Sequence, residues 1–343
     1  MAHQSLYRAY RPQAFKDVIG QDEVVQPLMA QIASGKIGHA YLFAGSRGLG
    51  KTSIARIFAR ELGTHDRDVY ELDAASNNGV DEIRALNDSI YTLPFASKYK
   101  IYILDEAHML SKNAWNALLK TLEEPPAHVI IILATTELDK VIETVRSRCQ
   151  IFKFKKPTRA GLAKLILDVG KKEGIAIEPS AAELMAMLGD GSYRDALSVL
   201  EKALSAGSGE KLSLEEVERA TGAPRHELVH TLAQALSDGN ADAALSAVRK
   251  TMDESIDMQL YLTLVLEHLR QILLVRHAPE LRPAIKEELG EDVYQEVETI
   301  AKAADSKLTH DTLRAFLDAA SRIRFSPVPA LPLELAVLEC LRS

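Results

Sequence analysis

The sequence predicts an α/β domain built on a parallel sheet, followed by two all-helical units. Residues 41–52, YLFAGSRGLGKT, place a full GxxxxGK[ST] pattern directly after an apolar strand. Near-continuous apolar runs alternate with helical patterns in this region, which is typical of a parallel sheet covered on both faces. From Pro157 onward the strand signal disappears and helical patterns remain. These observations predict domains at residues 1–156, 157–222 and 223–343.

The expected sheet has five strands, and each is a short run of apolar residues. A helix with Ile54, Ile57 and Phe58 on one stripe follows the first strand, and Trp115 lies on another helical stripe that we expect to be core. Ser213 and Glu216 have the spacing of a capping box, which predicts a helix start in the second unit. The predicted strands are residues 41–43, 69–72, 100–104, 129–134 and 150–154.

Composition and charge limit the class of protein. The chain has 343 residues with 47% hydrophobic and 26% charged side chains, so a folded, multidomain protein is expected. The net charge of −7 is uneven: residues 1–156 hold 20 Lys and Arg against 18 Asp and Glu (+2), and the remainder holds 21 against 30 (−9). Any nucleic acid is therefore expected to meet the first domain, through local patches.

The cysteines and the N-terminus favour a reducing, cytoplasmic setting. Cys149 and Cys340 are too few for a disulfide framework or a four-cysteine metal site. The N-terminus MAHQSLYRAYRP has no apolar segment of the kind found in signal peptides. The longest apolar stretch, residues 258–266, is far too short to cross a membrane, so no membrane partner is expected.

Each residue type in the glycine-rich loop has a physical reason. Glycines allow backbone conformations closed to other residues, so that successive N–H groups can surround polyphosphate oxygens. Lys51 can reach the outer phosphates and the Thr52 hydroxyl can ligate Mg²⁺, while the next helix presents its positive end to the same phosphates. The alternative is a plain glycine turn between strand and helix. The residues expected to bind nucleotide here are Gly45, Arg47, Gly48, Gly50, Lys51, Thr52 and Ser53.

An acidic pair ends the strand at residues 100–104. Asp105 is expected to hold Mg²⁺ and Glu106 to polarise the attacking water, although an N-cap for the next helix is the structural alternative. With Ala107 and His108 the pair spells DEAH, a helicase motif. Such helicases need a second sheet domain, which the helical remainder does not provide, so His108 is expected to be a helix-start residue.

Five further positions complete the expected nucleotide site or border it. Thr136, or its neighbour Thr135, ends the next strand, where it can bond the attacking water or the γ-phosphate. Arg148 is expected to act on the nucleotide of a neighbouring subunit, and a surface ion pair is its alternative. Arg194, on the first turn of a later helix, is expected to reach the nucleotide, with a surface pair to Asp195 as the alternative. Val18 and Ile19 either close over the base or simply pack.

These residues carry a resemblance to the gamma/tau subunits of bacterial DNA polymerase III clamp loaders, which are AAA+ ATPases. The long middle block and the SRC triplet are specific to that family and its close relatives. The matching stretches are YRAYRPQAFKDVIGQ (7–21), GSRGLGKTSIAR (45–56), ELDAASNNGVDEIR (71–84), YKIYILDEAHMLSKNAWNALLKTLEEPP (99–126), ILATTELDKV (132–141), SRCQIF (147–152), GSYRDALSVLEKAL (191–204) and SPVPALPLELAVL (326–338).

The resemblance implies a RecA-like head, a helical lid and a helical collar that joins a five-membered ring. It implies ATP and Mg²⁺ as ligands and, as partners, delta-type and delta-prime-type subunits, further copies of the chain, the sliding clamp and primer-template DNA. A cytoplasmic place in the nucleoid-associated replisome follows. The resemblance assigns phosphate and Mg²⁺ binding to Lys51 and Thr52, the metal to Asp105, the attacking water to Glu106, and γ-phosphate sensing to Thr136. Arg148 is then the arginine finger that acts on a neighbouring subunit, and Arg194 is the sensor in the lid. The segment with Asn77, Gly79 and Arg84 faces DNA.

One departure from the family pattern concerns zinc. The family usually carries a four-cysteine zinc module before the second strand, whereas residues 59–69 contain no cysteine, so zinc is not expected. Two alternative functions stay open. The chain is a structural ring subunit that turns over no ATP, or it is another AAA+ DNA-processing ATPase; the intact Lys51, Thr52, Asp105 and Glu106 oppose the first.

Overall fold

A five-stranded, all-parallel sheet forms the centre of the first unit of the computed structural model, which describes residues 4–207, 209, 211–254 and 256–341. The strand order is β2-β3-β4-β1-β5. The strands are β1 (Ala40–Ala44), β2 (Val69–Asp73), β3 (Lys100–Asp105), β4 (Val129–Thr135) and β5 (Gln150–Lys153). The predicted α/β fold class is confirmed.

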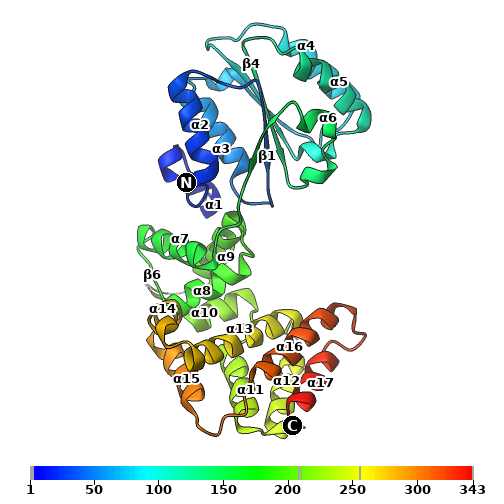
Figure 1. Ribbon diagram of the computed structural model, residues 1–343. Helices are drawn as coiled ribbons and strands as arrows, with labels where there is room; N and C mark the ends of the chain where they lie inside the picture. The colour runs from blue at the N-terminus through cyan, green and yellow to red at the C-terminus, as the bar shows by residue number, and fades with distance from the viewer. Residues whose placement is uncertain (1–3, 208, 210, 255, 342–343) are drawn as a thin grey trace. The chain divides into compact units, whose positions relative to one another are not determined.

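Helices cover both faces of this sheet (Figure 1). On one face, α2 and α3 pack through Leu28, Ile54 and Phe58 onto Ile103 and Ile132. On the other face, α4 and α5 pack through Ile83, Trp115 and Leu118, onto strand residues of opposite parity. The helices are α1 (Leu6–Ala9), α2 (Asp22–Ser34), α3 (Lys51–Glu61), α4 (Val80–Ile90), α5 (Lys112–Glu123) and α6 (Glu143–Arg146).

The two buried faces explain why the strand sequences are apolar throughout. Every residue of β1 and β4 is buried, because successive side chains point to opposite faces and both faces are covered. The edge strands β2 and β5 are largely exposed. Trp115 is core, as its helical stripe predicts.

The chain divides into two compact units. The first comprises residues 1–162 and 189–198, and the second comprises 163–188 and 199–343. The sequence-based division into three domains therefore stays a prediction. Two helices cross the unit boundaries: α7 (Arg159–Lys172) begins in the first unit, and the first turn of α9 (Tyr193–Ala206) belongs to it as well.

In its described residues, the second unit is helical apart from one short strand pair. The strands β6 (Ala176–Ile177) and β7 (Lys211–Leu212) pair in parallel, which corrects the expectation of an all-α lid. Two-residue strands are too short to leave a periodic pattern in a sequence. The remaining helices are α8 (Pro179–Leu188), α10 (Leu214–Thr221), α11 (His226–Asp238), α12 (Ala241–Asp253), α13 (Met258–His277), α14 (Arg282–Leu289), α15 (Glu291–Lys302), α16 (His310–Arg322) and α17 (Leu331–Leu341).

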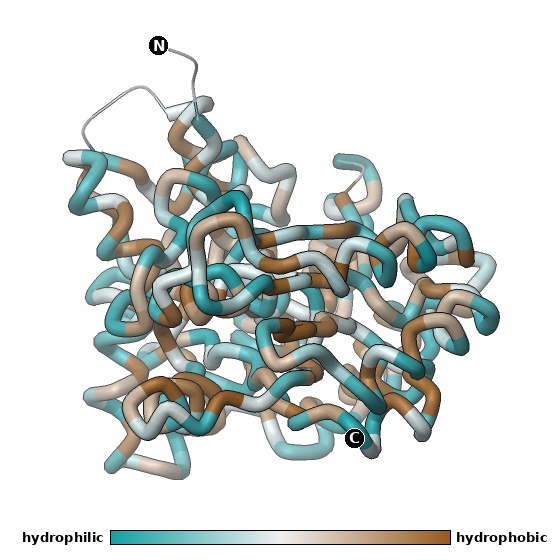
Figure 2. Tube along the Cα trace, turned by 90° about the horizontal axis from the view of Figure 1, so that it is seen from above, coloured by the Kyte–Doolittle hydropathy of each residue, from teal (hydrophilic) through white to brown (hydrophobic). Residues whose placement is uncertain are grey.

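Amphipathic helices build the core of the second unit. Hydrophobic and hydrophilic residues alternate along the Cα trace (Figure 2), and the hydrophobic ones of α11 to α17 meet around Tyr261, Val265 and Leu269 of α13. The predicted capping box at Ser213 and Glu216 is present at the start of α10. Among the described residues, no helix combines the length and the apolar character that a membrane crossing requires.

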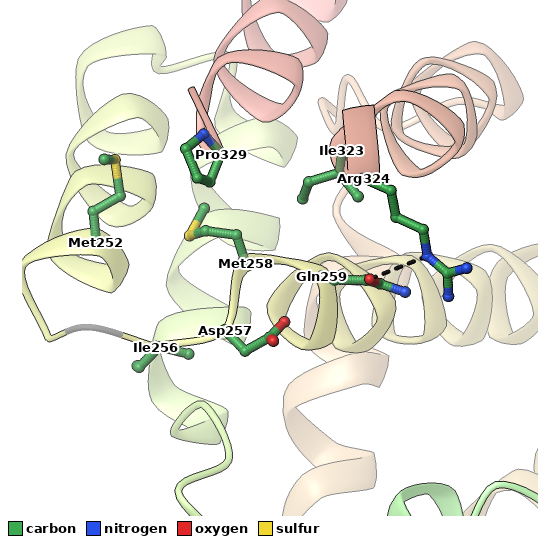
Figure 3. A pocket seen from close by; sticks show the side chains of 8 residues that line it. All are labelled: Met252, Ile256, Asp257, Met258, Gln259, Ile323, Arg324 and Pro329. Carbon is green, nitrogen blue, oxygen red and sulfur yellow. Dashed lines mark hydrogen bonds between the residues drawn. The ribbon is translucent and has the colours of Figure 1, made fainter. Parts of the chain in front are cut away.

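A pocket of about 400 Å³ opens in the second unit (Figure 3). Its lining is mostly apolar, and Arg324 at its edge donates a hydrogen bond to Gln259 (3.3 Å). None of its lining residues belongs to the predicted nucleotide site. The lining residues are Met252, Ile256, Asp257, Met258, Gln259, Ile323, Arg324 and Pro329.

Three histidines pack together inside the second unit. The ring of His268 lies 5.4 Å from that of His226 and 5.7 Å from that of His230, and Glu296 bonds His226 (2.8 Å). The pKa of His268 is lowered to about 3, chiefly by burial and further by His226 and His230. Its Nε2 is buried and has no hydrogen-bond partner in the part of the chain that the structure describes. Among the described residues, no group of three or more His, Cys, Asp or Glu side chains is arranged to hold a metal ion.

We expect this cluster to make the stability of the protein depend on pH. The folded-state pKa of His268 lies below the unfolded value of about 6.5, so the unfolded chain binds the extra proton. The contribution of His268 to the free energy of unfolding is therefore largest above pH 6.5 and falls as the pH drops towards 3, by about 2 kcal/mol at pH 5. Urea unfolding of the wild type and of H268Q between pH 5 and 7.5 measures this change in the free energy of unfolding.

The variant is needed because another buried group acts in the opposite direction. Burial raises the pKa of Glu218 to about 7, so this carboxyl group favours the folded state at low pH. Glu218 is present in both proteins, so the difference between their pH profiles reports His268. Identical slopes for the wild type and H268Q would contradict the prediction.

Candidate functional site

The loop between β1 and α3 depends on glycine for its backbone. Gly48 has φ 76° and Gly50 has φ 92°, a left-handed region that side chains rarely adopt. A Cβ at Gly48 would also lie 1.9 Å from the Ser192 hydroxyl, so this position is closed to larger residues. Arg47 is exposed, and Ser53 lies buried in the first turn of α3. The loop conformation leaves backbone N–H groups and the helix N-terminus together at the carboxyl end of β1.

Lys51 is a buried cation whose hydrogen bonds go to neutral groups. It is 5% exposed, and its ammonium donates to the carbonyls of Gly45 (2.7 Å) and Ser46 (2.9 Å). Its pKa is lowered, chiefly by burial and further by Arg194, while Glu106 and Asp105 act in the opposite direction. A bound polyphosphate would offset this positive charge, so the residues present fit such a ligand.

The acidic pair lies directly beside this loop. The Thr52 hydroxyl donates to Asp105 Oδ2 (2.7 Å), which brings together residues 53 positions apart in the chain. A hydroxyl and a carboxylate are oxygen ligands of the type that Mg²⁺ binds together with water and phosphate. The pair therefore fits a magnesium ion bound with a nucleotide.

Glu106 adopts a strained conformation between the acidic strand and the following turn. Its φ of 48° and ψ of 43° are left-handed, an uncommon state for a residue other than glycine that costs on the order of 1 kcal/mol. Its N–H donates to Asp105 Oδ1 (3.0 Å), and its Oε2 accepts a hydrogen bond from the Thr136 hydroxyl (3.0 Å). The geometry aims the carboxylate at the end of β4.

The two threonines at the end of β4 differ in their surroundings. Thr135 is fully buried, and its hydroxyl accepts from the Glu137 N–H (3.0 Å) and lies 3.2 Å from His108 Nδ1. Thr136 is partly exposed and bonds Glu106. Of the two candidates, Thr136 is the one that the fold joins to the acidic pair.

Arg148 lies apart from this group. Its guanidinium donates to the Thr144 carbonyl (2.8 Å) and pairs with Glu123 of α5 (2.6 Å), with its side chain 35% exposed. Among the described residues, its remaining polar contact is with Ser147. The fold therefore does not bring Arg148 to its own phosphate-binding loop, and the residue is neither buried nor locked in the core.

The segment around Arg194 contacts the glycine-rich loop and Ile19. The Tyr193 N–H donates to the Gly48 carbonyl (3.2 Å), and its hydroxyl donates to the carbonyl of Ile19 (2.7 Å). Arg194 lies on the first turn of α9 and places its guanidinium 6.0 Å from the ring of Tyr7. Its charge also lowers the pKa of Lys51.

Val18 and Ile19 lie in different surroundings. Val18 is half-buried against the core that contains α2 and α3, whereas the side chain of Ile19 is 47% exposed. Val18 thus packs, and a role for either residue at a nucleotide base stays a prediction.

Sequence reasoning did not single out several residues that shape the site. Arg11 donates to the Ser53 hydroxyl (2.7 Å), and Gln21 is buried and bonds both backbone groups of Lys155. Ser192 fills the space beside Gly48. The block YRAYRPQAFKDVIGQ contains Arg11 and Gln21, so the resemblance itself was the signal that could have found them.

The three residues expected to face DNA lie at the start of α4. Asn77 donates to the Asp73 carbonyl (2.9 Å), Gly79 is the N-cap, and the exposed Arg84 pairs with Asp81 (3.2 Å). The DNA role of the segment stays a prediction.

Three protein-family models match the chain. Residues 20–78 and 64–158 match "DNA polymerase III, delta subunit", residues 163–209 match "DNA polymerase III clamp loader subunit, ATPase lid domain", and residues 212–343 match "DNA polymerase III subunits gamma and tau domain III".

Curated relatives agree with these matches. DNA polymerase III subunit tau of Bacillus subtilis is 39% identical over 318 residues, which is 87% of this chain and 56% of the relative. DNA polymerase III subunit gamma of Buchnera aphidicola is 32% identical over 362 residues, and the match covers 99% of this chain and 99% of the relative. The chain spans about half the length of its tau and gamma/tau relatives from Bacillus subtilis, Salmonella typhimurium and Mycobacterium bovis.

Solved structures share the fold. The Holliday junction branch migration motor RuvB of Thermotoga maritima has a TM-score of 0.54 at 21% identity, over 74% of this chain and 90% of that one. At this identity the likeness concerns the fold alone.

Proposed function

Because the chain belongs to the gamma/tau subunits of bacterial DNA polymerase III, we propose that it is an ATPase subunit of a clamp loader. In this function, ATP binding and hydrolysis drive the loading of a sliding clamp onto primed DNA. The observation that carries the proposal is the hydrogen bond between Thr52 and Asp105 (2.7 Å), because it joins the phosphate-binding loop to the acidic pair.

The residues of this site divide the work on the triphosphate. Loop amides and Lys51 bind the phosphates. The Lys51 ammonium donates its hydrogen bonds to carbonyl oxygens and not to a carboxylate, so its positive charge is available to a phosphate. Thr52 and Asp105 would hold Mg²⁺, which would supply positive charge to offset that of the phosphates. The loop that surrounds the phosphates is shaped by Gly45, Arg47, Gly48, Gly50 and Ser53. The nucleotide base is bordered by Val18 and Ile19.

Glu106 and Thr136 act on the attacking water. The carboxylate of Glu106 orients the water and accepts its proton, while the Thr136 hydroxyl responds to the γ-phosphate. In the present geometry that hydroxyl donates to Glu106 (3.0 Å). A phosphate oxygen would compete for the same hydrogen, so nucleotide binding and the orientation of Glu106 are coupled.

Two arginines connect the site to motion and assembly. Arg148 is the finger that reaches the nucleotide of an adjacent subunit, and Arg194 is the sensor that contacts the chain's own nucleotide. The proposed partners are delta-type and delta-prime-type subunits, further copies of this chain in a five-membered ring, the sliding clamp and primer-template DNA. The segment with Asn77, Gly79 and Arg84 meets the DNA backbone, in the nucleoid-associated replisome of the cytoplasm.

The test of this function is ATP turnover by the chain mixed with its ring partners. We expect turnover to rise on adding sliding clamp and primed DNA together, and to be lost in Lys51→Ala, because the loop then lacks its phosphate-binding cation. A ring subunit that does not hydrolyse ATP would bind nucleotide without any stimulation. An AAA+ enzyme with another DNA task would be indifferent to the clamp, and either result would refute the proposal.

A further inference from the structure

We propose that His108, in the turn that follows β3, is a positioning residue for Glu106 that holds one carboxylate oxygen of Glu106 in place. The inference rests on the proposed ATPase function and adds a residue to it. His108 lies in the short 3-10 helix Ala107–Met109, as its sequence position predicts, but its ring makes contacts that a helix-start residue does not need.

The ring of His108 is buried and lies between two carboxylates. Its side chain is 7% exposed, with Nδ1 3.4 Å from Glu106 Oε2 and Nε2 3.3 Å from Glu137 Oε1. The Thr135 hydroxyl, 3.2 Å from Nδ1, fixes the ring from the buried side. In this orientation Nδ1 lies between the Thr135 hydroxyl, at 3.2 Å, and Glu106 Oε2, at 3.4 Å.

Glu137 is itself anchored at the surface. Lys140 donates a hydrogen bond to its carboxylate (2.9 Å), and the pKa of Glu137 is lowered chiefly by this bond, with a smaller contribution from His108. A chain of contacts thus runs from Lys140 through Glu137 and His108 to Glu106. It fixes the imidazole in the way that outer partners orient the ligands of a metal.

The same oxygen of Glu106 is held twice. Oε2 accepts the hydrogen bond of Thr136 and faces His108, so the two groups share one carboxylate oxygen and leave Oε1 for the water. When the Thr136 hydroxyl turns to a phosphate oxygen, His108 remains as the group that keeps Oε2 in place. The contribution of His108 therefore falls on the chemical step and not on nucleotide binding.

Two substitutions separate the two nitrogens of the ring. An asparagine amide nitrogen can occupy the place of Nδ1 and keep the contact with Glu106, whereas glutamine reaches towards the place of Nε2 and keeps the contact with Glu137. We expect H108A and H108Q to lower kcat by about 10-fold to 100-fold, which is the range found for residues that orient the ligands of a metal. H108N is expected to stay within about threefold of wild type.

The experiment measures kcat and KM for ATP in the assembly with clamp and primed DNA, together with the affinity for a non-hydrolysable ATP analogue. KM and analogue affinity should be unchanged in all three variants. His128 provides a matched control, because it is a half-buried histidine of the same unit whose ring bonds the Ile90 carbonyl (3.1 Å) before β4 begins. H128N should leave kcat unchanged.

Two results would overturn the role of His108 alone. One is a stimulated wild type with an H108A variant of equal kcat. The other is an equal loss in H108A, H108N and H108Q with a lowered melting temperature, because a purely structural histidine behaves in that way. Absence of stimulated turnover in the wild type would instead refute the proposed function, and the role of His108 with it.

Discussion

Replacing Arg148 by alanine is expected to lower the stimulated ATP turnover of the assembled ring by about 10³-fold, while nucleotide binding survives. The expected size is that of an arginine that stabilises transition-state charge from a neighbouring subunit. Turnover of the assembly and binding of a fluorescent ATP analogue, measured on the same preparation, check both halves of the prediction.

The contacts of Arg148 are compatible with this role. Its guanidinium pairs with Glu123 at 2.6 Å, but the two side chains are 35% and 50% exposed. Such an exposed pair contributes only about 0 to 1 kcal/mol, so exchanging Glu123 for a triphosphate costs little. The position on the surface of the first unit leaves the guanidinium accessible to another subunit.

Glu123→Gln is the matched control for Arg148→Ala. It removes the intramolecular partner and leaves the arginine, so turnover should stay within about threefold of wild type if the pair is as weak as its exposure indicates. Equal turnover in wild type and Arg148→Ala would remove the interface role. A loss of nucleotide binding in Arg148→Ala would contradict it as well, because the residue does not contact its own loop.

Replacing Glu106 by glutamine is expected to lower kcat by about 10²-fold to 10⁴-fold and to leave ATP binding intact. The range is that of a lost general base. Glutamine has nearly the same shape and still accepts the Thr136 hydrogen bond at its amide oxygen, so the loop and the acidic strand keep their arrangement. Single-turnover hydrolysis and analogue binding measure the two quantities.

The neighbouring Asp105 offers a contrast to Glu106. Asp105→Asn is expected to weaken binding of ATP in the presence of Mg²⁺, because Asp105 accepts a hydrogen bond from Thr52 and is proposed to hold the metal with it. Glu106→Gln should not. If both substitutions lower Mg²⁺-dependent binding to the same extent, Glu106 acts as a metal ligand and its assignment as the base is wrong.

The sequence alone predicted the fold class and the placement of the motifs. Strands such as β4 are buried on both faces, so they must be apolar at every position, and that requirement is visible without a structure. The phosphate-binding loop has a fixed spacing because glycine, lysine and threonine are needed at particular backbone positions. Family membership followed from the same local blocks, and the relatives confirm it.

The contacts across the chain were beyond reach of the sequence. These contacts join residues whose spacing along the chain follows no helical or strand periodicity. Examples are the His108 ring between Glu106 and Glu137, the Ser192 hydroxyl against Gly48, and the hydrogen bond from Arg11 to Ser53. The strand pair β6 and β7 was missed for the same reason, since two residues show no alternation. Only the packed chain decided these neighbours.

The sequence by itself determined which residues are expected to bind and hydrolyse a nucleoside triphosphate, because local backbone demands and buried faces restrict residue types at fixed spacings. The tertiary structure decided which of them share a hydrogen bond. It joined Thr52 to Asp105 and Thr136 to Glu106, and it left Arg148 on the surface beside Glu123. Parallel strands bring their carboxyl ends to one edge of a sheet, and side-chain distances at that edge depend on the order of the strands, which no local pattern records.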